Sequence, residues 1–211
     1  MRLRNVKNKR EIMATSNYII NEPENNKNNW HLIFGNNNPI HIEIGMGKGK
    51  FIIDNAIKYP NINFIGIERY DSVIARAIQR ANEYNLSNLK LIIYDANDIE
   101  NIFDREISRI YLNFSDPWPK NRHARRRLTS DLFLKKYDNI FKGDNQIHQK
   151  TDNQQLFEYS IESLSEYGYK IKNVSLDLKN SNYKDNITTE YEDKFNQKNI
   201  PINRLEAYKK D

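Results

Sequence analysis

Apolar and amphipathic segments alternate along residues 41–178 of the chain. The segments that we expect to be strands are residues 41–45, 63–68, 89–96, 109–115, 145–151 and 169–178. The segments that we expect to be helices are residues 48–58, 71–84, 130–142 and 153–167. Strands that alternate with helices of this length predict βαβ units and a parallel sheet with helices on both faces.

The pattern changes after residue 178. Residues 202–208 are expected to form a seventh strand, although the residues before them hold only one charged helix-like turn, at about residues 190–195. Two consecutive strands without a helix between them favour antiparallel pairing. The predicted fold is therefore α/β and Rossmann-like, a seven-stranded and mostly parallel sheet with an antiparallel edge strand.

The composition is that of one intracellular domain. The chain has 211 residues, 38% of them hydrophobic, which is enough to bury a core. No apolar run approaches the roughly 18 residues of a membrane span, and no apolar stretch follows the basic N-terminus as in a signal peptide. Cysteine is absent, which suits a reducing cytoplasm. We expect a domain at residues 40–211 with a basic extension, residues 1–39, that packs on it.

Three glycines and two acids follow predicted strands, where α/β sheets bind their ligands. Gly45, Gly47 and Gly49 join the first strand to the first helix, and glycine lets a ligand approach the backbone closely. Their spacing, GxGxG, differs from the GxGxxG of dinucleotide-binding proteins. Glu68 ends the next strand, where an acid characteristically binds ribose hydroxyls, and Asp95 ends the third, where it would meet an adenine amino group. The alternative for each acid is a helix cap or a solvated strand end.

Glu43 lies within an apolar strand, where an unpaired carboxylate is costly. It would either accept hydrogen bonds from the glycine loop or attract a positively charged ligand. The alternative is a residue that faces the edge of the sheet.

The fourth strand runs into the sequence NFSDPWPK, residues 113–120. Two prolines stiffen this loop, so that it presents Asp116, Trp118 and Lys120 in one conformation. An acid, a flat aromatic ring and a cation held together can recognise a purine by edge hydrogen bonds, stacking and phosphate contact. The alternative is a rigid turn with the Trp118 ring packed inward.

Basic residues gather beside this loop. Residues 120–127 hold five of them and the first ten residues hold five more, within a formal net charge of +5. A basic run next to a ligand loop favours RNA binding, and Arg125, Arg126 and Arg127 are its densest part. The alternative is a solvated face.

The sequence RIYLNFSDPWPKNRHARRRL, residues 109–128, closely resembles the bacterial type of the tRNA (guanine-N7)-methyltransferase family. So do the glycine loop with its preceding acid, the KTDN sequence at residues 150–153 and the TEYE sequence at residues 189–192. The resemblance spans roughly four-fifths of the chain. It departs at Gly143-Asp144, where two glycines are common, and at Gln149, where an aromatic residue is usual; both concern local packing and not the chemistry.

The resemblance implies a Rossmann-like methyltransferase fold, S-adenosylmethionine as methyl donor, and tRNA as partner, with a guanine at position forty-six of the variable loop as acceptor. The residues expected at the donor are Glu43, Gly45, Gly47, Gly49, Glu68, Asp95 and Asp116. The residues expected at the tRNA are Lys120, Asp152, Thr189, Glu190, Tyr191 and Glu192, together with Arg125 and Arg126 from the basic run.

N7 of neutral guanine carries a lone pair and no proton, so methyl transfer to it needs no general base. We expect Asp116 to be the catalytic residue, which orients the base or the donor and stabilises the positive charge. The four histidines are scattered, and we expect no metal. We expect a monomer or a homodimer that does not bind membranes. The alternatives are methylation of another acceptor, an RNA-binding protein with a degenerate nucleotide site, or, less well matched by the glycine spacing, an NAD-dependent oxidoreductase.

Overall fold

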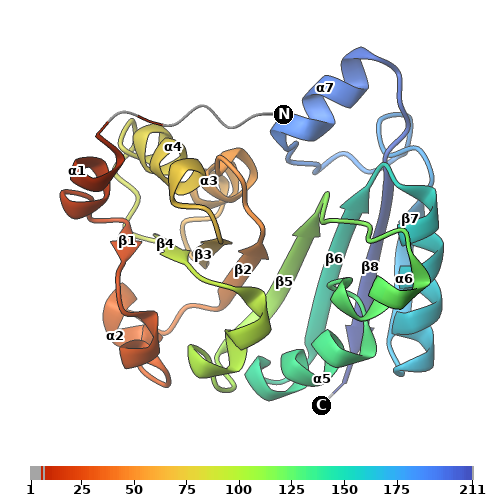
Figure 1. Ribbon diagram of the computed structural model, residues 1–211, viewed down its shortest axis with the longest axis horizontal. Coiled ribbons are helices and arrows are strands. Elements are labelled where there is room, and N and C mark those ends of the chain that lie inside the picture. The colour runs from red at the N-terminus through yellow and green to blue at the C-terminus, as the bar shows by residue number, and fades with distance from the viewer. Residues whose placement is uncertain (1–5, 7, 211) are drawn as a thin grey trace.

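A mixed sheet forms the centre of the computed structural model, which describes residue 6 and residues 8–210 (Figure 1). In the described part the sheet has eight strands in the order β1-β4-β3-β2-β5-β6-β8-β7. The strands are β1 (Ile19–Ile20), β2 (Ile40–Ile44), β3 (Asn63–Glu68), β4 (Leu89–Ile93), β5 (Ile107–Asn113), β6 (Asn145–Thr151), β7 (Lys170–Ser175) and β8 (Asn203–Lys209). The α-helices are α1 (Lys9–Ala14), α2 (Trp30–Phe34), α3 (Lys50–Lys58), α4 (Asp71–Ala81), α5 (Asp131–Ile140), α6 (Gln154–Glu166) and α7 (Glu190–Gln197). Three short 3₁₀ helices are η1 (Pro23–Asn26), η2 (Ala96–Asn101) and η3 (Asn121–Arg126).

Both faces of the sheet are covered, as the alternating pattern predicts. Along β3, Phe64 packs with α3 and α4, whereas the next residue, Ile65, packs in the cluster that contains α5 and α6. Side chains of successive strand residues point to opposite faces, so these two clusters are the two sides of the sheet. The Rossmann-like α/β class is therefore confirmed.

The sheet differs from the prediction in its number of strands. It has eight because β1, only two residues long, pairs parallel with β4 at one edge. At the other edge β7 pairs antiparallel with β8, as the prediction of an antiparallel edge strand has it, and β8 itself lies between β6 and β7. The reason is burial: Leu205 and Ala207 of β8 are fully buried, whereas most residues of β7 are exposed. A strand whose residues are mostly buried belongs in the interior of a sheet, and the exposed β7 takes the edge.

The segment before β2 shares the core of the sheet. Trp30 in α2 is fully buried and donates a hydrogen bond from Nε1 to the Ile102 carbonyl oxygen at 2.8 Å. Lys9 in α1 forms an ion pair with Asp71 of α4 at 2.6 Å. Of the basic N-terminal residues, Arg2, Arg4 and Lys7 lie outside the described residues. The proposed division at residue 40 thus separates two parts that share one core.

Candidate active site

A cleft of about 1600 Å³ opens at the carboxyl ends of the central strands. The predicted site residues that line it are Glu43, Gly45, Gly47, Glu68, Asp95, Asp116, Arg125, Arg126, Thr189, Glu190 and Tyr191. The predicted site residues outside its lining are Gly49, Lys120, Asp152 and Glu192. Segments separated by up to about 150 positions in the sequence therefore meet in one place, at the edge of the sheet where α/β proteins bind ligands.

The glycine loop forms part of the wall of the cleft. Gly45 and Gly47 have positive φ angles of 77° and 59°, and a Cβ on either would meet no atom within 4 Å. Glycine is favoured there by the backbone conformation, and the absent side chains leave room for a ligand. Gly49 serves packing instead, because a Cβ there would lie only 3.0 Å from Cβ of Ala77 in α4.

Glu68 holds the glycine loop in place. Its carboxylate accepts hydrogen bonds from the backbone N–H groups of Gly47 at 3.1 Å, Arg69 at 2.9 Å and Tyr70 at 3.1 Å. A carboxylate has about four acceptor positions, so one remains for a hydroxyl in the cleft. Glu68 therefore shapes the loop and keeps the capacity expected of a ribose-binding acid.

Glu43 is the most unusual group of the cleft. It is 2% exposed; Oε1 accepts a hydrogen bond from Nδ2 of Asn113 at 2.9 Å, and Oε2 has no partner among the described residues. Burial raises the pKa of Glu43 to about 8, although Asn113 and the Lys150 ammonium oppose this shift. A buried acceptor without a partner is costly, and a positively charged ligand would remove that cost. Glu43 thus fits the amino and sulfonium groups of S-adenosylmethionine.

Asp95 caps η2 and also faces the cleft. Its Oδ1 accepts hydrogen bonds from the backbone and side-chain nitrogens of Asn97 at 2.9 and 2.7 Å. Oδ2 lies 3.7 Å from the Arg69 guanidinium. The backbone hydrogen bond from Asn97 is the main reason that the pKa of Asp95 is lowered. Asp95 therefore combines the structural role with an ionised carboxylate that can accept a hydrogen bond from a ligand amine.

The loop at residues 113–120, which we call the DPWP loop, has a strained backbone that is held in place by hydrogen bonds from Arg127. Phe114 and Trp118 have positive φ angles of 53° and 43°, a conformation that bulky residues rarely adopt. Arg127 donates from Nε to the Pro117 carbonyl and from Nη2 to the Trp118 carbonyl, both at 3.1 Å. Arg127 is 7% exposed, so its interpretation as part of an RNA-binding surface is corrected: it supports the loop from inside. Asp116 itself is exposed at the cleft.

The rest of the basic run faces outward. Arg125 and Arg126 are exposed and line the cleft. The Arg126 guanidinium lies 4.9 Å from the centre of the Trp118 ring, and His123 meets the same ring edge-on at 5.8 Å. Trp118 is half-buried and borders the cleft, so the alternative of a ring packed into the core does not hold.

Helix α7 closes one side of the cleft. Thr189 caps the helix by accepting a hydrogen bond from the Glu192 N–H at 3.0 Å. The Glu190 carboxylate is bound by Lys48 at 3.1 Å and by Arg80 at 3.2 Å. The Tyr191 side chain, 58% exposed, stacks on Phe114 of the DPWP loop at 5.9 Å. The TEYE segment is therefore anchored to the glycine loop, to α4 and to the loop that carries Asp116.

Lys150 anchors the segment before α7, a role that the sequence pattern did not predict. It is 6% exposed, and its Nζ donates to Oδ1 of Asn186 at 2.5 Å, to the Ile187 carbonyl at 2.7 Å and to Oε2 of Glu192 at 2.9 Å. Burial lowers the pKa of Lys150. Glu192 is also buried, so this residue, predicted to contact tRNA, is instead directed at Lys150. The sequence feature that could have predicted this role is a charged residue within a predicted strand, the same feature that singled out Glu43.

Two general observations concern residue 6 and residues 8–210. Within this range no group of three or more His, Cys, Asp or Glu side chains is placed to hold a metal ion. Within the same range no helix has both the length and the apolar character needed to cross a membrane.

The fold is similar to the folds of solved methyltransferases. "Structure of an Antibiotic Related Methyltransferase" matches with a TM-score of 0.63 at 21% identity, over 87% of this chain and 94% of that one. A 16S rRNA (adenine(1408)-N(1))-methyltransferase from Catenulisporales acidiphilia, solved with the cosubstrate SAM, matches with a TM-score of 0.61 at 11% identity, over 87% and 91%. These likenesses show the fold: the chain has the Rossmann-like α/β fold that these methyltransferases share.

The sequence comparisons identify the family. Residues 37–205 match a family described as "Putative methyltransferase". A tRNA (guanine-N(7)-)-methyltransferase of Lachnoclostridium phytofermentans is 51% identical over 211 residues, 99% of both chains. Proteins of the same name from Geobacillus sp. and Bacillus licheniformis are 52% and 50% identical, over 98% and 93% of this chain and 95% and 92% of theirs. The chain belongs to the tRNA (guanine-N7)-methyltransferase family.

Proposed function

We propose that this chain transfers the methyl group of S-adenosylmethionine to N7 of a guanine in tRNA. The observation that carries the proposal is one cleft that unites the glycine loop, the strand-end acids and the DPWP loop in a chain about half identical to enzymes with this name. The acceptor that we propose is the guanine at position forty-six in the variable loop.

The donor side of the cleft is built at the carboxyl ends of β2, β3 and β4. The bound donor supplies an electrophilic methyl group on a positively charged sulfur. Glu43 offers its unpartnered carboxylate oxygen to that positive charge, Glu68 offers an acceptor to the ribose, and Asp95 offers one to the adenine amine. The main-chain turn at Gly45 and Gly47 lets the donor lie close to the backbone.

The acceptor side is the DPWP loop with α7. Because N7 of guanine holds a free lone pair, the residues here need not remove a proton. They hold the base in line with the methyl group and stabilise the charge that the base acquires. Trp118 and Tyr191 offer aromatic rings at the cleft, and Asp116 offers an exposed carboxylate there. Arg125 and Arg126, and Lys120 of the same basic run, offer cations to the tRNA backbone.

The test is a methylation assay with two tRNA transcripts, one with guanine and one with adenine at position forty-six. Nucleoside analysis by mass spectrometry should find 7-methylguanosine in the first transcript alone. A different methylated nucleoside, or equal methylation of both transcripts, would contradict the proposal. Calorimetry with S-adenosylmethionine and with NAD separates it from an oxidoreductase, because only the former should bind.

Asp116 can be tested in the same assay. Asp116→Asn keeps the shape of the side chain and removes its charge, whereas Asp116→Ala removes both. Removing one preorganised electrostatic interaction costs on the order of 10²–10³ in rate, so we expect kcat to fall by this factor, in Asp116→Ala at least as much as in Asp116→Asn. Circular dichroism checks the fold. Near-normal turnover of Asp116→Ala would make the loop a scaffold only.

For the molecule as a whole, we propose a cytoplasmic enzyme that binds tRNA, without a metal, as a monomer or a homodimer. Light scattering after gel filtration measures the oligomeric state. Activity that survives dialysis against a chelator is the expected result, and activity restored only by added metal would contradict it.

A further inference from the structure

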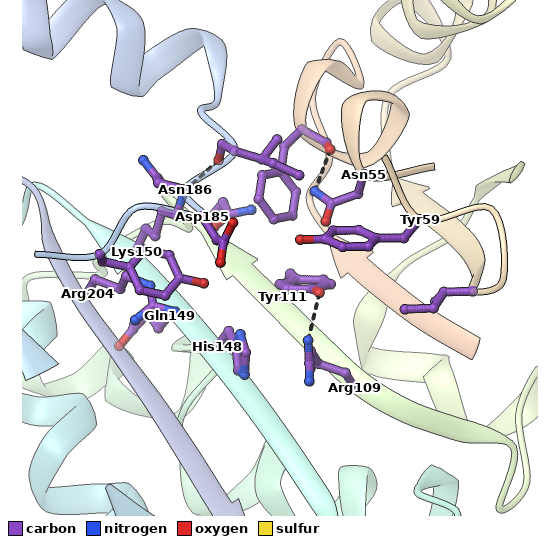
Figure 2. A pocket seen from close by; sticks show the side chains of 15 residues that line it. Asn55, Tyr59, Arg109, Tyr111, His148, Gln149, Lys150, Asp185, Asn186 and Arg204 are labelled. Carbon is purple, nitrogen blue, oxygen red and sulfur yellow. Dashed lines mark hydrogen bonds between the residues drawn. The ribbon is translucent and has the colours of Figure 1, made fainter. Parts of the chain in front are cut away.

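A second cavity, of about 200 Å³, lies beside the donor cleft on the α3 side of the sheet (Figure 2). The proposed function does not use it. Aromatic and polar side chains line it, from α3, from the strands β5, β6 and β8, and from the segment before α7. We call this cavity the rear pocket and define it by Asn55, Tyr59, Arg109, Tyr111, His148 and Tyr183.

The rear pocket and the donor cleft are neighbouring compartments of one groove. Phe51 and Asn113 line both of them. Asn186 and Ile187 line the rear pocket, and residues 189–191 of the same segment line the donor cleft. A ligand in the donor cleft therefore lies next to the rear pocket.

Asn55 presents a free hydrogen-bond acceptor to the rear pocket. It is 3% exposed, and its Nδ2 donates to the Phe51 carbonyl at 2.8 Å. This bond fixes the orientation of the amide, so that its oxygen faces the cavity beside Tyr59 (Figure 2). That oxygen accepts no hydrogen bond from the described residues and is not closed off from solvent. It can therefore accept a hydrogen bond from an N–H donor of a ligand in the cavity.

The charge of the rear pocket is positive. The Arg109 guanidinium binds Oε1 of Gln146 at 2.7 and 3.0 Å and the Tyr111 hydroxyl at 3.2 Å, and in the described part no carboxylate lies within ion-pair distance of it. Burial, together with Arg109, lowers the pKa of His148 to about 3, so the ring is neutral. The one carboxylate of the lining, Asp185, is paired with Lys58 at 3.4 Å. A cationic ligand is disfavoured and an RNA segment is favoured.

The volume of the rear pocket fits one base of an RNA. Pockets for drug-sized ligands span about 300–1,000 Å³, and the rear pocket is smaller, with room for one planar base. RNA-binding proteins stack unpaired bases on aromatic side chains and bind their edges by hydrogen bonds. Tyr59 supplies such a ring. Tyr111 is 7% exposed and packs against Phe51 and His148, and the Arg204 guanidinium lies 3.7 Å from the centre of the Tyr183 ring.

We propose that the rear pocket takes a second, unstacked base of the tRNA, close in sequence to the methylated guanine. The base carries an exocyclic amino group, which donates to the oxygen of Asn55, and its acceptor edge faces Arg109. This inference rests on the proposed function, because it assumes that tRNA occupies the neighbouring cleft.

Steady-state kinetics test the inference in three variants: Tyr59→Ala, Arg109→Gln and Asn55→Leu. Stacking on an aromatic ring typically contributes enough that its removal in Tyr59→Ala should raise KM for tRNA about tenfold. The donor Kd from calorimetry should stay within twofold of the wild-type value. The matched controls are Tyr84→Ala and Lys142→Gln, which remove an exposed ring and an exposed charge outside both compartments. KM values equal to those of the controls would overturn the inference.

A cross-link locates the base without relying on a destabilised variant. Tyr183, 37% exposed, lines the pocket, and Tyr183→p-benzoylphenylalanine places a photoreactive group there. Irradiation with the tRNA transcript should give an adduct within a few nucleotides of the methylated guanine, mapped by reverse transcription. Absence of an RNA adduct, or an adduct of twice the protein mass, would overturn the inference; the latter would assign the pocket to a contact between two copies.

These outcomes separate the two proposals. A wild-type protein that forms no 7-methylguanosine contradicts the proposed function. A wild-type protein that forms it, with pocket variants that match their controls, contradicts the rear pocket alone.

Discussion

At the scale of single residues, Glu43 and Lys150 show how burial prepares a side chain for a partner. Glu43 has one carboxylate oxygen without a bond and a pKa raised to about 8 by desolvation. In the free protein at neutral pH, this group is therefore mostly protonated. Lys150 is equally buried, but its ammonium is paired with Glu192 and two oxygens of one segment. Glu43 can therefore bind a positively charged ligand, whereas Lys150 is already paired within the chain.

Donor binding should release a proton from Glu43. A positive ligand favours the carboxylate and lowers its pKa in the complex, so donor affinity should rise with pH up to about 8. Calorimetry in buffers of different ionisation enthalpy measures the proton released. In Glu43→Gln this release should disappear, together with a loss of affinity. The Glu43 carboxyl should titrate over roughly the two pH units below 8. A wild-type affinity that does not change between about pH 6 and 8 would contradict the prediction.

Removal of the Lys150 ammonium should destabilise the fold. Lys150→Met leaves Glu192 buried without its cation, which costs about 3–5 kcal/mol in comparable cases. The double variant Lys150→Met with Glu192→Met removes both charges and should recover much of this loss. Urea denaturation measures both. Equal stability of the single and double variants would show that the pair is not coupled.

At the scale of elements, the basic run at residues 120–127 divides into two functions. Arg125 and Arg126 are exposed at the cleft, whereas Arg127 is buried and hydrogen-bonded to the backbone of the DPWP loop. Three consecutive arginines look alike in the sequence. Only the end of η3 at Arg126, which turns the chain inward, separates them.

The division predicts two phenotypes. Arg125→Ala with Arg126→Ala should weaken tRNA binding and reduce its salt dependence by about one unit of slope for each phosphate that the protein no longer neutralises. Arg127→Ala should leave the salt slope unchanged but lower kcat and Tm, because the strained loop loses its brace. Filter binding at several salt concentrations and turnover measurements check both. An identical salt slope in the double variant would make these two residues a solvated face.

The same distinction shows what the sequence could reveal. Gly45, Glu68 and Asp95 were predictable because each follows a strand whose apolar pattern is local. The bonds of Arg127 and Lys150 were not, since each partner is set by tertiary contacts. The position of β8 was not predictable for a related reason: periodicity identifies residues 202–208 as a strand, but the burial of Leu205 inside the sheet depends on tertiary contacts.

At the scale of the whole molecule, two buried histidines lower the free energy of unfolding at acid pH. Burial, with Arg109, lowers the pKa of both His41 and His148 from 6.5 to about 3. The unfolded chain takes up these protons first as the pH falls, so the free energy of unfolding drops below about pH 6.5 and continues to drop until about pH 3.

The prediction is a decline in Tm between pH 6.5 and 4.5, above the range where most carboxylates titrate. In His41→Gln the decline in this window should be smaller, because one of the two groups no longer takes up a proton on unfolding. Differential scanning fluorimetry across this range measures the effect. An unchanged slope in the variant would assign the acid sensitivity to other groups.

The position of β8 also has a consequence for synthesis. In the finished sheet β8 separates β6 from β7, yet the ribosome makes β7 before β8. A nascent chain that has released β7 therefore holds two unpaired strand edges on either side of a gap one strand wide. Unpaired edges attract other strands, so this interval exposes the chain to wrong partners, its own or those of neighbouring chains. Residues 203–209 close the gap, and they reach the sheet only after every wall of the donor cleft has been made.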